Sequence, residues 1–382
     1  MKIGIDARFF RPSTGGLSRY TRNLLKYLFH LAPEIEWVVF LTTEDKKEFD
    51  LKGDNIEKVI VDIPHYSLKE QYLLPRILNS YHLDLVHFTN FNHPIFYKGP
   101  FVVTIHDLTM FAYPAPRQRV FFRRLPFIWT LKKALQRSQK IFVPSQATAN
   151  DLDIYFAAQR EKIVVTPEGV EPVFRPLVPQ QKKENQLILQ QKLGIQTPYI
   201  LFVSQWRPHK GILELLDAYE VLKYRWKIPI NLVLVGSPHP AFPEIASCVE
   251  KVQRKATGIF TPGFVQEEEL VLLYQMAKVF VLPSFYEGFG LPVLEAMASG
   301  VPVVCSQSSA LPEVGGQAVF YCDPYRYHTI AKGLKKVLTD RNLQSKLRAE
   351  GLKRAHLFNW KKMAKMVLKN YKAIISSQEG AK

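Results

Sequence analysis

Two glutamates flank a glycine-rich turn within the segment 283–304, and their spacing points to carbohydrate chemistry. Glu287 lies in the turn, and Glu295 follows in the first turn of a helix that should begin at Pro292. A proline at the start of a helix and a glycine such as Gly300 at its end are typical of a short helix between two strands. Two carboxylates on the carboxyl-end side of the expected strands could form the catalytic pair of a glycosidase. They could equally accept hydrogen bonds from neighbouring sugar hydroxyls, as the acidic residue of a dinucleotide-binding fold does with ribose.

Two loops in the first half of the chain each follow an expected strand. Gly15 and Gly16 allow close backbone approach, and the helix after them offers unpaired N–H groups to an anion. His106 and Asp107 end another strand, where a histidine could orient a hydroxyl or stabilise charge. The simpler alternatives are an ordinary turn for the glycines and a structural histidine with a capping aspartate.

A fourth loop, residues 206–211, contains Arg207 and Lys210 just before an expected helix. A cation at a helix N-terminus is unfavourable because it opposes the helix dipole. A bound diphosphate would reverse that sign, since the lysine and the helix end would both attract it. Other enzyme motifs are missing: there is no GxGxxG after a strand, no phosphate-binding P-loop, no HExxH and no GxSxG.

Apolar runs of strand length alternate with amphipathic helices along the chain, which predicts parallel sheets covered on both faces. The expected strands are 3–5, 37–41, 58–61, 85–88, 101–105, 140–143, 163–166, 199–203, 231–235, 258–260, 279–282, 301–305 and 317–320. The expected helices are 18–31, 68–79, 119–137, 147–156, 212–224, 267–276 and 292–299. We therefore expect an α/β protein with two doubly wound, Rossmann-like domains.

The domain boundaries follow from a change in composition after Phe174. We expect an N-terminal domain over 1–178, a polar linker over 179–197 and a second domain over 198–355. Ligands of such sheets bind at the carboxyl ends of the strands, so the cleft between the domains is the expected site. The segment 356–382 reads as a basic amphipathic helix, and packing against the N-terminal domain is favoured over a membrane-surface role.

The charge of the 382-residue chain is unusual, with 51 Lys+Arg against 34 Asp+Glu and a formal net charge of +17. Residues 111–140 carry eight basic side chains and no acidic one, and residues 351–375 carry seven and none. Such an excess attracts anionic partners, although solvated helix faces are an equally plain reading. Nucleic acid is disfavoured because no nucleic-acid motif accompanies the charge.

Membrane-spanning segments, secretory signals and metal-binding cysteines would each leave a pattern in the sequence. There is no apolar run of membrane-spanning length, and Asp6 interrupts the region where a secretory signal would be apolar. Cys248, Cys305 and Cys322 show no metal-ligand spacing and suggest a reducing compartment. We therefore expect a cytoplasmic protein.

The segment from Glu287 to Val304 resembles the E-x7-E signature of retaining glycosyltransferases of family 4, also called glycosyl transferases group 1, which have the GT-B fold. The resemblance runs along nearly the whole chain, in the family's order. Its weaker landmarks are Gly15-Gly16 and residues 104–108, 143–145, 165–170, 208–210 and 310–314. The resemblance implies transfer of a hexose from a nucleotide sugar, with no cofactor and no metal.

The resemblance implies a role for each residue that matches a family motif. Glu295 would bind the ribose of the donor, and Glu287 would contact the transferred sugar, so the glycosidase reading falls. His106 would lie beside the anomeric carbon and stabilise positive charge there, and Lys210 with Arg207 would neutralise the diphosphate. Further donor contacts would come from Gly15, Gly16, Gly236, Gly288, Phe289, Gly290 and Leu291, and acceptor or other contacts from Asp107, Arg123 and Arg124.

One departure concerns the diphosphate. Family members often have Gly-Arg where this chain has Ser204-Gln205, so the second phosphate cation must be Arg207 or be missing. The retaining reaction of the family is thought to proceed by same-face attack, with the departing phosphate oxygen taking the acceptor's proton.

The choice of donor and acceptor rests on the family resemblance alone. The His-Asp-Leu loop followed by aromatic residues is similar to bacterial mannosyltransferases of polysaccharide biosynthesis, which favours GDP-mannose. UDP-glucose or another UDP-sugar is the alternative, and a GT-B sugar-nucleotide epimerase is a weaker one. The expected acceptor is a saccharide or a lipid-linked saccharide. Basic residues in 111–140 would then give peripheral contact with the anionic inner face of the cytoplasmic membrane.

Overall fold

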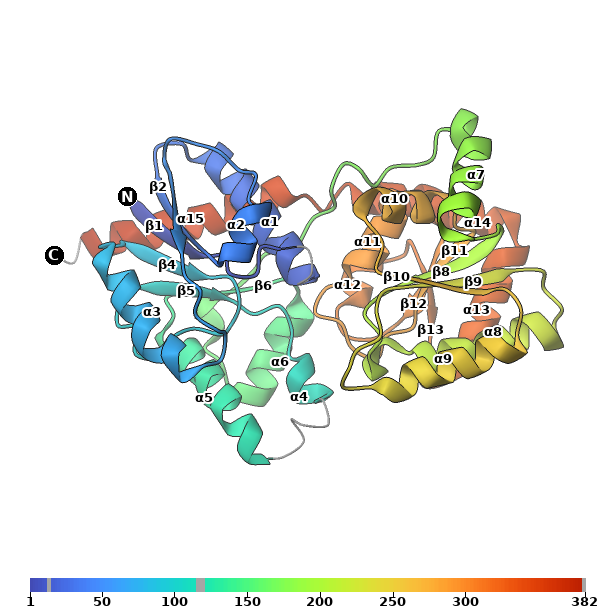
Figure 1. Ribbon diagram of the computed structural model, residues 1–382, viewed down its shortest axis with the longest axis horizontal. Coiled ribbons are helices and arrows are strands. Elements are labelled where there is room, and N and C mark those ends of the chain that lie inside the picture. The colour runs from blue at the N-terminus through green and yellow to red at the C-terminus, as the bar shows by residue number, and fades with distance from the viewer. Residues whose placement is uncertain (12–14, 115–120, 380–382) are drawn as a thin grey trace. The chain divides into compact units, whose positions relative to one another are not determined.

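The computed structural model describes residues 1–11, 15–114 and 121–379, and the side chains of residues 121–124 lie outside this description. The chain forms two compact units (Figure 1). The first contains the described residues up to Leu108, residues 121–169 and the C-terminal helix α15 (Trp360–Glu379). The second contains the short helix α4 (Thr109–Ala112) and Val170–Phe358.

The first unit is built on a seven-stranded parallel sheet with the order β3-β2-β1-β4-β5-β6-β7. Its strands are β1 (Lys2–Asp6), β2 (Glu36–Leu41), β3 (Ile56–Ile60), β4 (Leu85–Phe88), β5 (Phe101–Thr104), β6 (Ile141–Val143) and β7 (Ile163–Val165). The central strands are buried on both faces, which is why they read as continuous apolar runs. Ile5 of β1 pairs with Val39 on one side and with His87 on the other.

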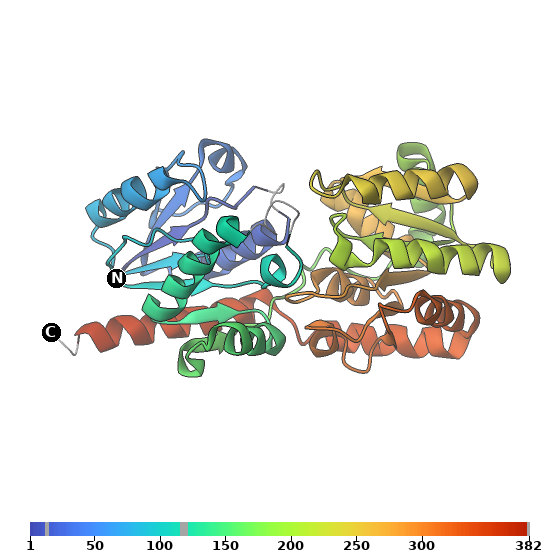
Figure 2. The same ribbon diagram turned by 90° about the horizontal axis from the view of Figure 1, so that it is seen from below.

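Helices cover both faces of the first sheet. Its helices are α1 (Gly16–Leu31), α2 (Thr43–Glu48), α3 (Leu68–Ser80), α5 (Phe121–Arg137), α6 (Gln146–Phe156) and α15. Right-handed crossovers place α1 on one face and α3 and α5 on the other, as Figures 1 and 2 show. None of the helices among the described residues is long and apolar enough to cross a bilayer.

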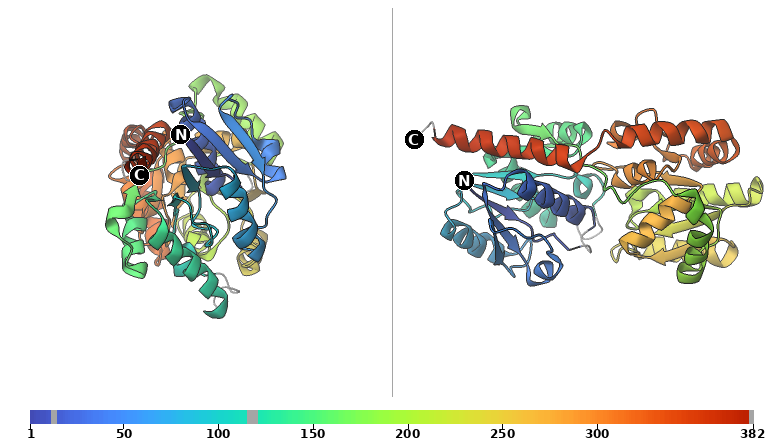
Figure 3. Two further views of the ribbon diagram at one scale, coloured as in Figure 1. Left: turned by 90° about the vertical axis from the view of Figure 1, so that its left-hand side faces the viewer. Right: turned by 90° about the horizontal axis from the view of Figure 1, so that it is seen from above.

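Helix α15 returns to the first unit and lies beside α1 (Figure 3). Its apolar side chains are buried there, and the ring of Trp360 contacts Tyr20 of α1 with centroids 6.5 Å apart. Its lysines at 361, 362, 365 and 369 are exposed. The apolar stripe is therefore covered by protein rather than left open for a membrane.

The second unit is built on a six-stranded parallel sheet with the order β10-β9-β8-β11-β12-β13. Its strands are β8 (Tyr199–Val203), β9 (Asn231–Val235), β10 (Ile259–Gly263), β11 (Val279–Leu282), β12 (Val303–Ser306) and β13 (Phe320–Cys322). The expected strand at 317–320 is displaced toward the C-terminus, because the edge strand is defined by pairing of Phe320 with Val304. The two sheets confirm the expected doubly wound architecture.

The helices of the second unit also form two layers. They are α4, α7 (Lys182–Leu193), α8 (Ile212–Glu220), α9 (Pro243–Lys255), α10 (Glu267–Met276), α11 (Leu291–Ala298), α12 (Leu311–Gly315), α13 (Tyr327–Thr339) and α14 (Arg341–Ala355). Helix α8 continues into a π-helical turn, Val221–Arg225, so the expected helix at 212–224 has two parts. Helices α8, α9 and α13 cover one face, and α10 and α11 the other (Figure 1).

The segment expected as a linker, 179–197, differs from a plain connection. It contains helix α7, which contacts α10 and buries Leu189 in the core of the second unit. The chain passes from the first unit to the second after Gly169, ahead of the expected boundary at 178. Polar composition suggested a linker because only one face of this short helix meets the protein.

Candidate active site

The second sheet reverses its winding direction between β8 and β11, which are neighbours in the middle of the sheet. Doubly wound sheets bind ligands at such a switch point, outside the carboxyl ends of the strands. The loop after β8 carries Lys210, and the loop after β11 carries Glu287. The topology therefore brings two of the predicted donor residues to the place where a ligand is expected.

Lys210 and Glu287 form a close ion pair. The Nζ atom of Lys210 donates to both carboxylate oxygens of Glu287, each at 2.8 Å. The hydroxyl of Ser284 also donates to Oε1 of Glu287 at 2.7 Å. The two charged side chains keep 17% and 11% of their surface exposed, so an entering ligand can reach the pair. An anion that binds Lys210 would release Glu287 to accept hydrogen bonds from hydroxyl groups.

The backbone around this pair is held by close contacts. Gly211 has φ of +69°, and a Cβ there would lie 2.3 Å from the carbonyl oxygen of Pro283. Phe285 N–H donates to the carbonyl of His209 at 2.8 Å. Burial, followed by the charges of Lys210 and Arg207, lowers the pKa of His209 to about 2. His209 is therefore a neutral structural residue between two cations.

Glu295 is the fifth residue of α11, just past its first turn, because the helix begins one residue earlier than predicted; its side chain is buried, at 3% exposed. The hydroxyl of Tyr274 on α10 donates to Oε2 of Glu295 at 2.9 Å. This buried bond fixes the carboxylate, because an isolated buried charge would be costly. A fixed carboxylate can accept two adjacent hydroxyl groups without first losing side-chain freedom.

The turn between the two glutamates presents mainly backbone. Gly290 adopts φ of +110° and caps α11, and a Cβ there would meet the side chain of Leu311 at 2.6 Å. Phe289 is buried and packs edge-on against Phe358, with ring centroids 5.7 Å apart. Gly288 is also buried, and Leu291 is the first residue of the helix. Only the main chain of Phe289 is left to contact a ligand.

Arg207, the predicted second cation, lies in the same loop after β8 as Lys210. The Nε of Arg207 donates to the side-chain oxygen of Gln205, one of the two departing residues, at 2.9 Å. Gly236 follows β9 with φ of +116°, and a Cβ there would lie 2.0 Å from the carbonyl oxygen of Ser204. The two loops therefore approach each other closely at Gly236, and its role as a donor contact stays a prediction.

In the first unit, His106 is bounded by two acceptors. Its Nε2–H donates to the carbonyl of Thr89 at 2.9 Å, and its Nδ1 lies 3.5 Å from Oε1 of Glu168. The side chain of His106 is 14% exposed and that of Glu168 is 6% exposed. The ring is therefore fixed in orientation beside a nearly buried carboxylate, at the carboxyl end of β5.

A network of buried hydroxyl and imidazole groups lies next to His106. The hydroxyl of Thr104 is 2.8 Å from the hydroxyl of Tyr20 and 2.7 Å from Nε2 of His87, whose Nδ1 bonds the hydroxyl of Tyr371 on α15. The ring of Tyr20 meets that of His106 edge-on at 4.7 Å. Burial, followed by the charge of His106, lowers the pKa of His87 to about 3. Helix α15 thus contributes to the support of the predicted catalytic histidine.

The remaining predicted residues are more loosely placed. Gly15 has φ of +64° and precedes α1, and a Cβ added to it or to Gly16 would meet none of the described residues beyond its chain neighbours within 4 Å. Asp107 is exposed beside His106. The side chains of Arg123 and Arg124 lie outside the described residues.

Sequence reasoning missed several supporting residues. Glu168 lies in the landmark 165–170 and Ser284 in the segment 283–304, and each follows a strand, β7 and β11, but neither was assigned a role. Tyr274 carried no signal, because its helix was interpreted only by its amphipathic pattern. Ser309, which donates to the carbonyl of Glu287 at 2.6 Å, comes from a loop after the next strand.

Two further features bear on ligands. Among residues 1–11, 15–114 and 121–379, no group of three or more His, Cys, Asp or Glu side chains is arranged to hold a metal ion.

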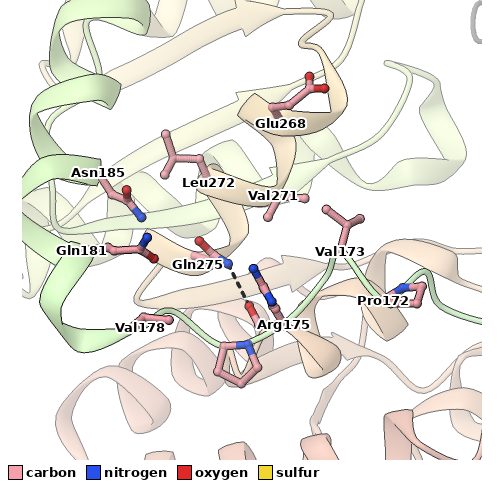
Figure 4. A pocket seen from close by; sticks show the side chains of 11 residues that line it. Pro172, Val173, Arg175, Val178, Gln181, Asn185, Glu268, Val271, Leu272 and Gln275 are labelled. Carbon is pink, nitrogen blue, oxygen red and sulfur yellow. Dashed lines mark hydrogen bonds between the residues drawn. The ribbon is translucent and has the colours of Figure 1, made fainter.

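A hollow of about 430 Å³ lies where the segment after Gly169 meets α7 and α10. Figure 4 shows Gln275 in this hollow, donating to the carbonyl of Arg175 at 3.0 Å. The residues that line it belong to none of the predicted sites.

Comparison with known proteins identifies the family. The family described as glycosyl transferases group 1 matches residues 185–354, and glycosyltransferase family 4 matches residues 14–174. O-antigen chain mannosyltransferase B of Escherichia coli is 30% identical, and the match covers 98% of this chain and 100% of that protein. The chain belongs to the group 1 glycosyltransferases.

Solved structures agree with the GT-B fold of this glycosyltransferase. Sucrose-phosphate synthase from Thermosynechococcus elongatus superposes with a TM-score of 0.80 at 21% identity, covering 99% of this chain and all of that one. HepE of Anabaena, solved in complex with UDP-glucose, gives a TM-score of 0.76 at 16% identity over 98% and 100% of the two chains. At these identities the structures establish the fold alone.

Proposed function

We propose that this glycosyltransferase transfers mannose from GDP-mannose to a saccharide or lipid-linked saccharide acceptor during assembly of a surface polysaccharide. The observation that carries a nucleotide-sugar site is the Lys210–Glu287 pair at the switch point of the second sheet. The choice of mannose and of the pathway is supported by the name of the E. coli relative. UDP-glucose is the second candidate donor, because HepE was solved with that molecule.

In the proposed reaction the diphosphate leaves the anomeric carbon with its electron pair, and the acceptor oxygen forms the new bond on the same face. The acceptor's proton passes to the departing phosphate oxygen, so the configuration is retained. Lys210 and Arg207 stabilise the negative charge that develops on the diphosphate. Because these cations supply that charge, we propose that the reaction needs no metal ion.

The other polar groups are assigned to the sugar and the ribose. Once Lys210 turns to the diphosphate, Glu287 accepts hydroxyl groups of the transferred sugar, with Ser284 keeping its orientation. Glu295, fixed by Tyr274, accepts the ribose hydroxyls. Glu168 supplies negative charge near the positive anomeric carbon, and it lies beside His106, the residue assigned next to that carbon.

Thermal unfolding with UDP-, GDP- and ADP-sugars tests the proposed donor site. A ligand at 100 times its Kd should stabilise the folded protein by about 2.7 kcal/mol. We expect GDP-mannose to give this stabilisation in the wild type and Glu295→Gln to lose most of it, since the neutral amide accepts hydroxyl groups less strongly. Glu250→Gln, an exposed residue on α9, is the control.

The outcomes of this panel separate the alternatives. Stabilisation by UDP-glucose instead of GDP-mannose would replace the donor and keep the site. Absence of any shift in the wild type, at ligand concentrations up to several millimolar, would contradict a nucleotide-sugar site.

We also propose peripheral contact with an anionic membrane through α5. On this helix Trp129 is 50% exposed and Leu125 is 40% exposed, and Lys132 is exposed beside them. Aromatic and basic side chains together are typical of surfaces that meet lipid headgroups. Each basic residue near an anionic surface contributes about 1 kcal/mol.

Sedimentation with vesicles containing phosphatidylserine tests this contact. Replacing Arg123, Arg124, Lys132 and Lys133 by glutamine should reduce binding at least tenfold, and added salt should reduce wild-type binding in the same way. The matched control replaces four exposed lysines of α15, at 361, 362, 365 and 369, by glutamine. Equal loss in both variants would indicate a nonspecific effect of net charge and would contradict contact through α5.

A further inference from the structure

The loops that follow β8 and β9 are bonded to each other. Trp206 N–H donates to the carbonyl of Ser237 at 3.1 Å, and Ser204 N–H donates to the carbonyl of Val235 at 3.1 Å. The close approach at Gly236 leaves no room for a side chain between them. Any group on the β9 loop is therefore held at a fixed distance from the loop that carries Arg207.

His239 on the β9 loop faces Arg207. The Nη2 of Arg207 lies 3.2 Å from Nε2 of His239, with its N–H directed at that nitrogen. On the other side of the ring, Ala241 N–H points at Nδ1 from 3.1 Å. Gln205 holds the guanidinium in this orientation through its Nε.

These contacts contain more donors than the histidine can accept. Each N–H needs a lone pair on the nitrogen that it faces, and a neutral imidazole has one lone pair and one N–H. If Nδ1 accepts from Ala241, then Nε2–H faces the N–H of Arg207. If Nε2 accepts from Arg207, then Nδ1–H faces the N–H of Ala241. In either tautomer two N–H groups lie head to head at one ring nitrogen, and an acceptor between them would relieve that contact.

We propose that His239 is a ligand of the donor's diphosphate, and that one phosphate oxygen is the acceptor shared by His239 Nε2–H and Arg207. This inference rests on the proposed nucleotide-sugar function and adds a residue to its site. With the anion bound, Nδ1 accepts from Ala241, Nε2–H donates to the oxygen, and the guanidinium turns to the same oxygen. Both ring nitrogens of His239 then have a complementary partner.

The charge balance favours a phosphate over a neutral acceptor. Arg207 brings a positive charge to this side of the His239 ring. Burial, followed by the charge of Arg207, lowers the pKa of His239 below its ordinary value. A bound anion would raise that pKa, because it would offset the positive charge of Arg207. A carbonyl group of the nucleobase could accept the hydrogen bond but carries no negative charge to attract the guanidinium.

Calorimetric titration of a ligand series tests the assignment. The ligands are the nucleoside, its monophosphate and its diphosphate, in the guanosine and uridine series. The variant is His239→Phe, which keeps a ring against Phe242, whose centroid lies 5.4 Å away, and removes both nitrogens. The control is His328→Phe on α13, outside the site.

We expect His239→Phe to weaken diphosphate binding about tenfold and to leave nucleoside binding unchanged. Adding Arg207→Gln should cost less than the sum of the single changes, because the two side chains share one oxygen. Unchanged diphosphate binding in His239→Phe, or an equal loss for the bare nucleoside, would overturn this inference while the nucleotide site stands. A wild-type protein that binds no nucleotide at all would overturn the proposed function, and this inference with it.

Discussion

A Lys210→Met variant should lose about a thousandfold in kcat/KM, whereas its thermal stability should fall only modestly. Removing one preorganised donor from a developing charge costs about 10²–10³ in rate. Lys210 also contacts both oxygens of Glu287 at 2.8 Å, so its removal leaves that carboxylate unpaired and facing the diphosphate. Steady-state kinetics with radiolabelled donor, together with thermal unfolding, measures both effects.

Two further variants show where the loss comes from. Lys210→Met combined with Glu287→Gln removes both charges, and it should restore stability without restoring activity. Lys336→Met breaks a lysine–aspartate pair of 3.1 Å on the surface of α13, and it should change neither quantity. If Lys210→Met retained kcat/KM within fivefold of the wild type, Lys210 would not stabilise the leaving group.

Glu168→Gln should lower kcat by about 10- to 100-fold while leaving the affinity for the nucleotide unchanged. The carboxylate lies 3.5 Å from His106 and is almost buried, so its charge is weakly screened. We expect that charge to stabilise the positive anomeric carbon in the transition state, and glutamine has the same shape without it. The nucleotide-binding residues assigned above, apart from Gly15 and Gly16, come from the other unit, which is why binding should be unaffected.

The readouts for Glu168 are kcat at saturating donor and the Kd of the nucleoside diphosphate by calorimetry. Glu161→Gln, an exposed glutamate ahead of β7, is the matched control. An unchanged kcat would contradict a role for Glu168. A parallel loss of donor affinity and activity would instead indicate a general disturbance of the fold.

Much of the fold could be predicted because buried parallel strands have a simple sequence pattern. The strands 85–88, 199–203, 231–235 and 279–282 have the predicted bounds, since their ends coincide with the ends of apolar runs. Helix α14 escaped prediction because it packs on α11 and not on a sheet, so it needs only a narrow apolar stripe. Helix α7 was interpreted as linker for the same reason.

The residue types and their order along the chain settle the family, the two doubly wound domains and the loops that carry the chemistry. Each chemical group follows a strand, and the carboxyl ends of parallel strands form one edge, so local sequence is enough to place them on that edge. It also places Glu287 and Glu295 on a glycine turn and the helix after it.

Which side chains meet was decided by the tertiary structure. The strand order brings the β8 and β11 loops together and so pairs Lys210 with Glu287, although 77 residues separate them. Tyr274 reaches Glu295 from a helix on the same face of the sheet, and Glu168 reaches His106 across β6. Such contacts depend on strand adjacency and helix packing, which no local pattern encodes, because the interactions that select them act between segments distant in the chain.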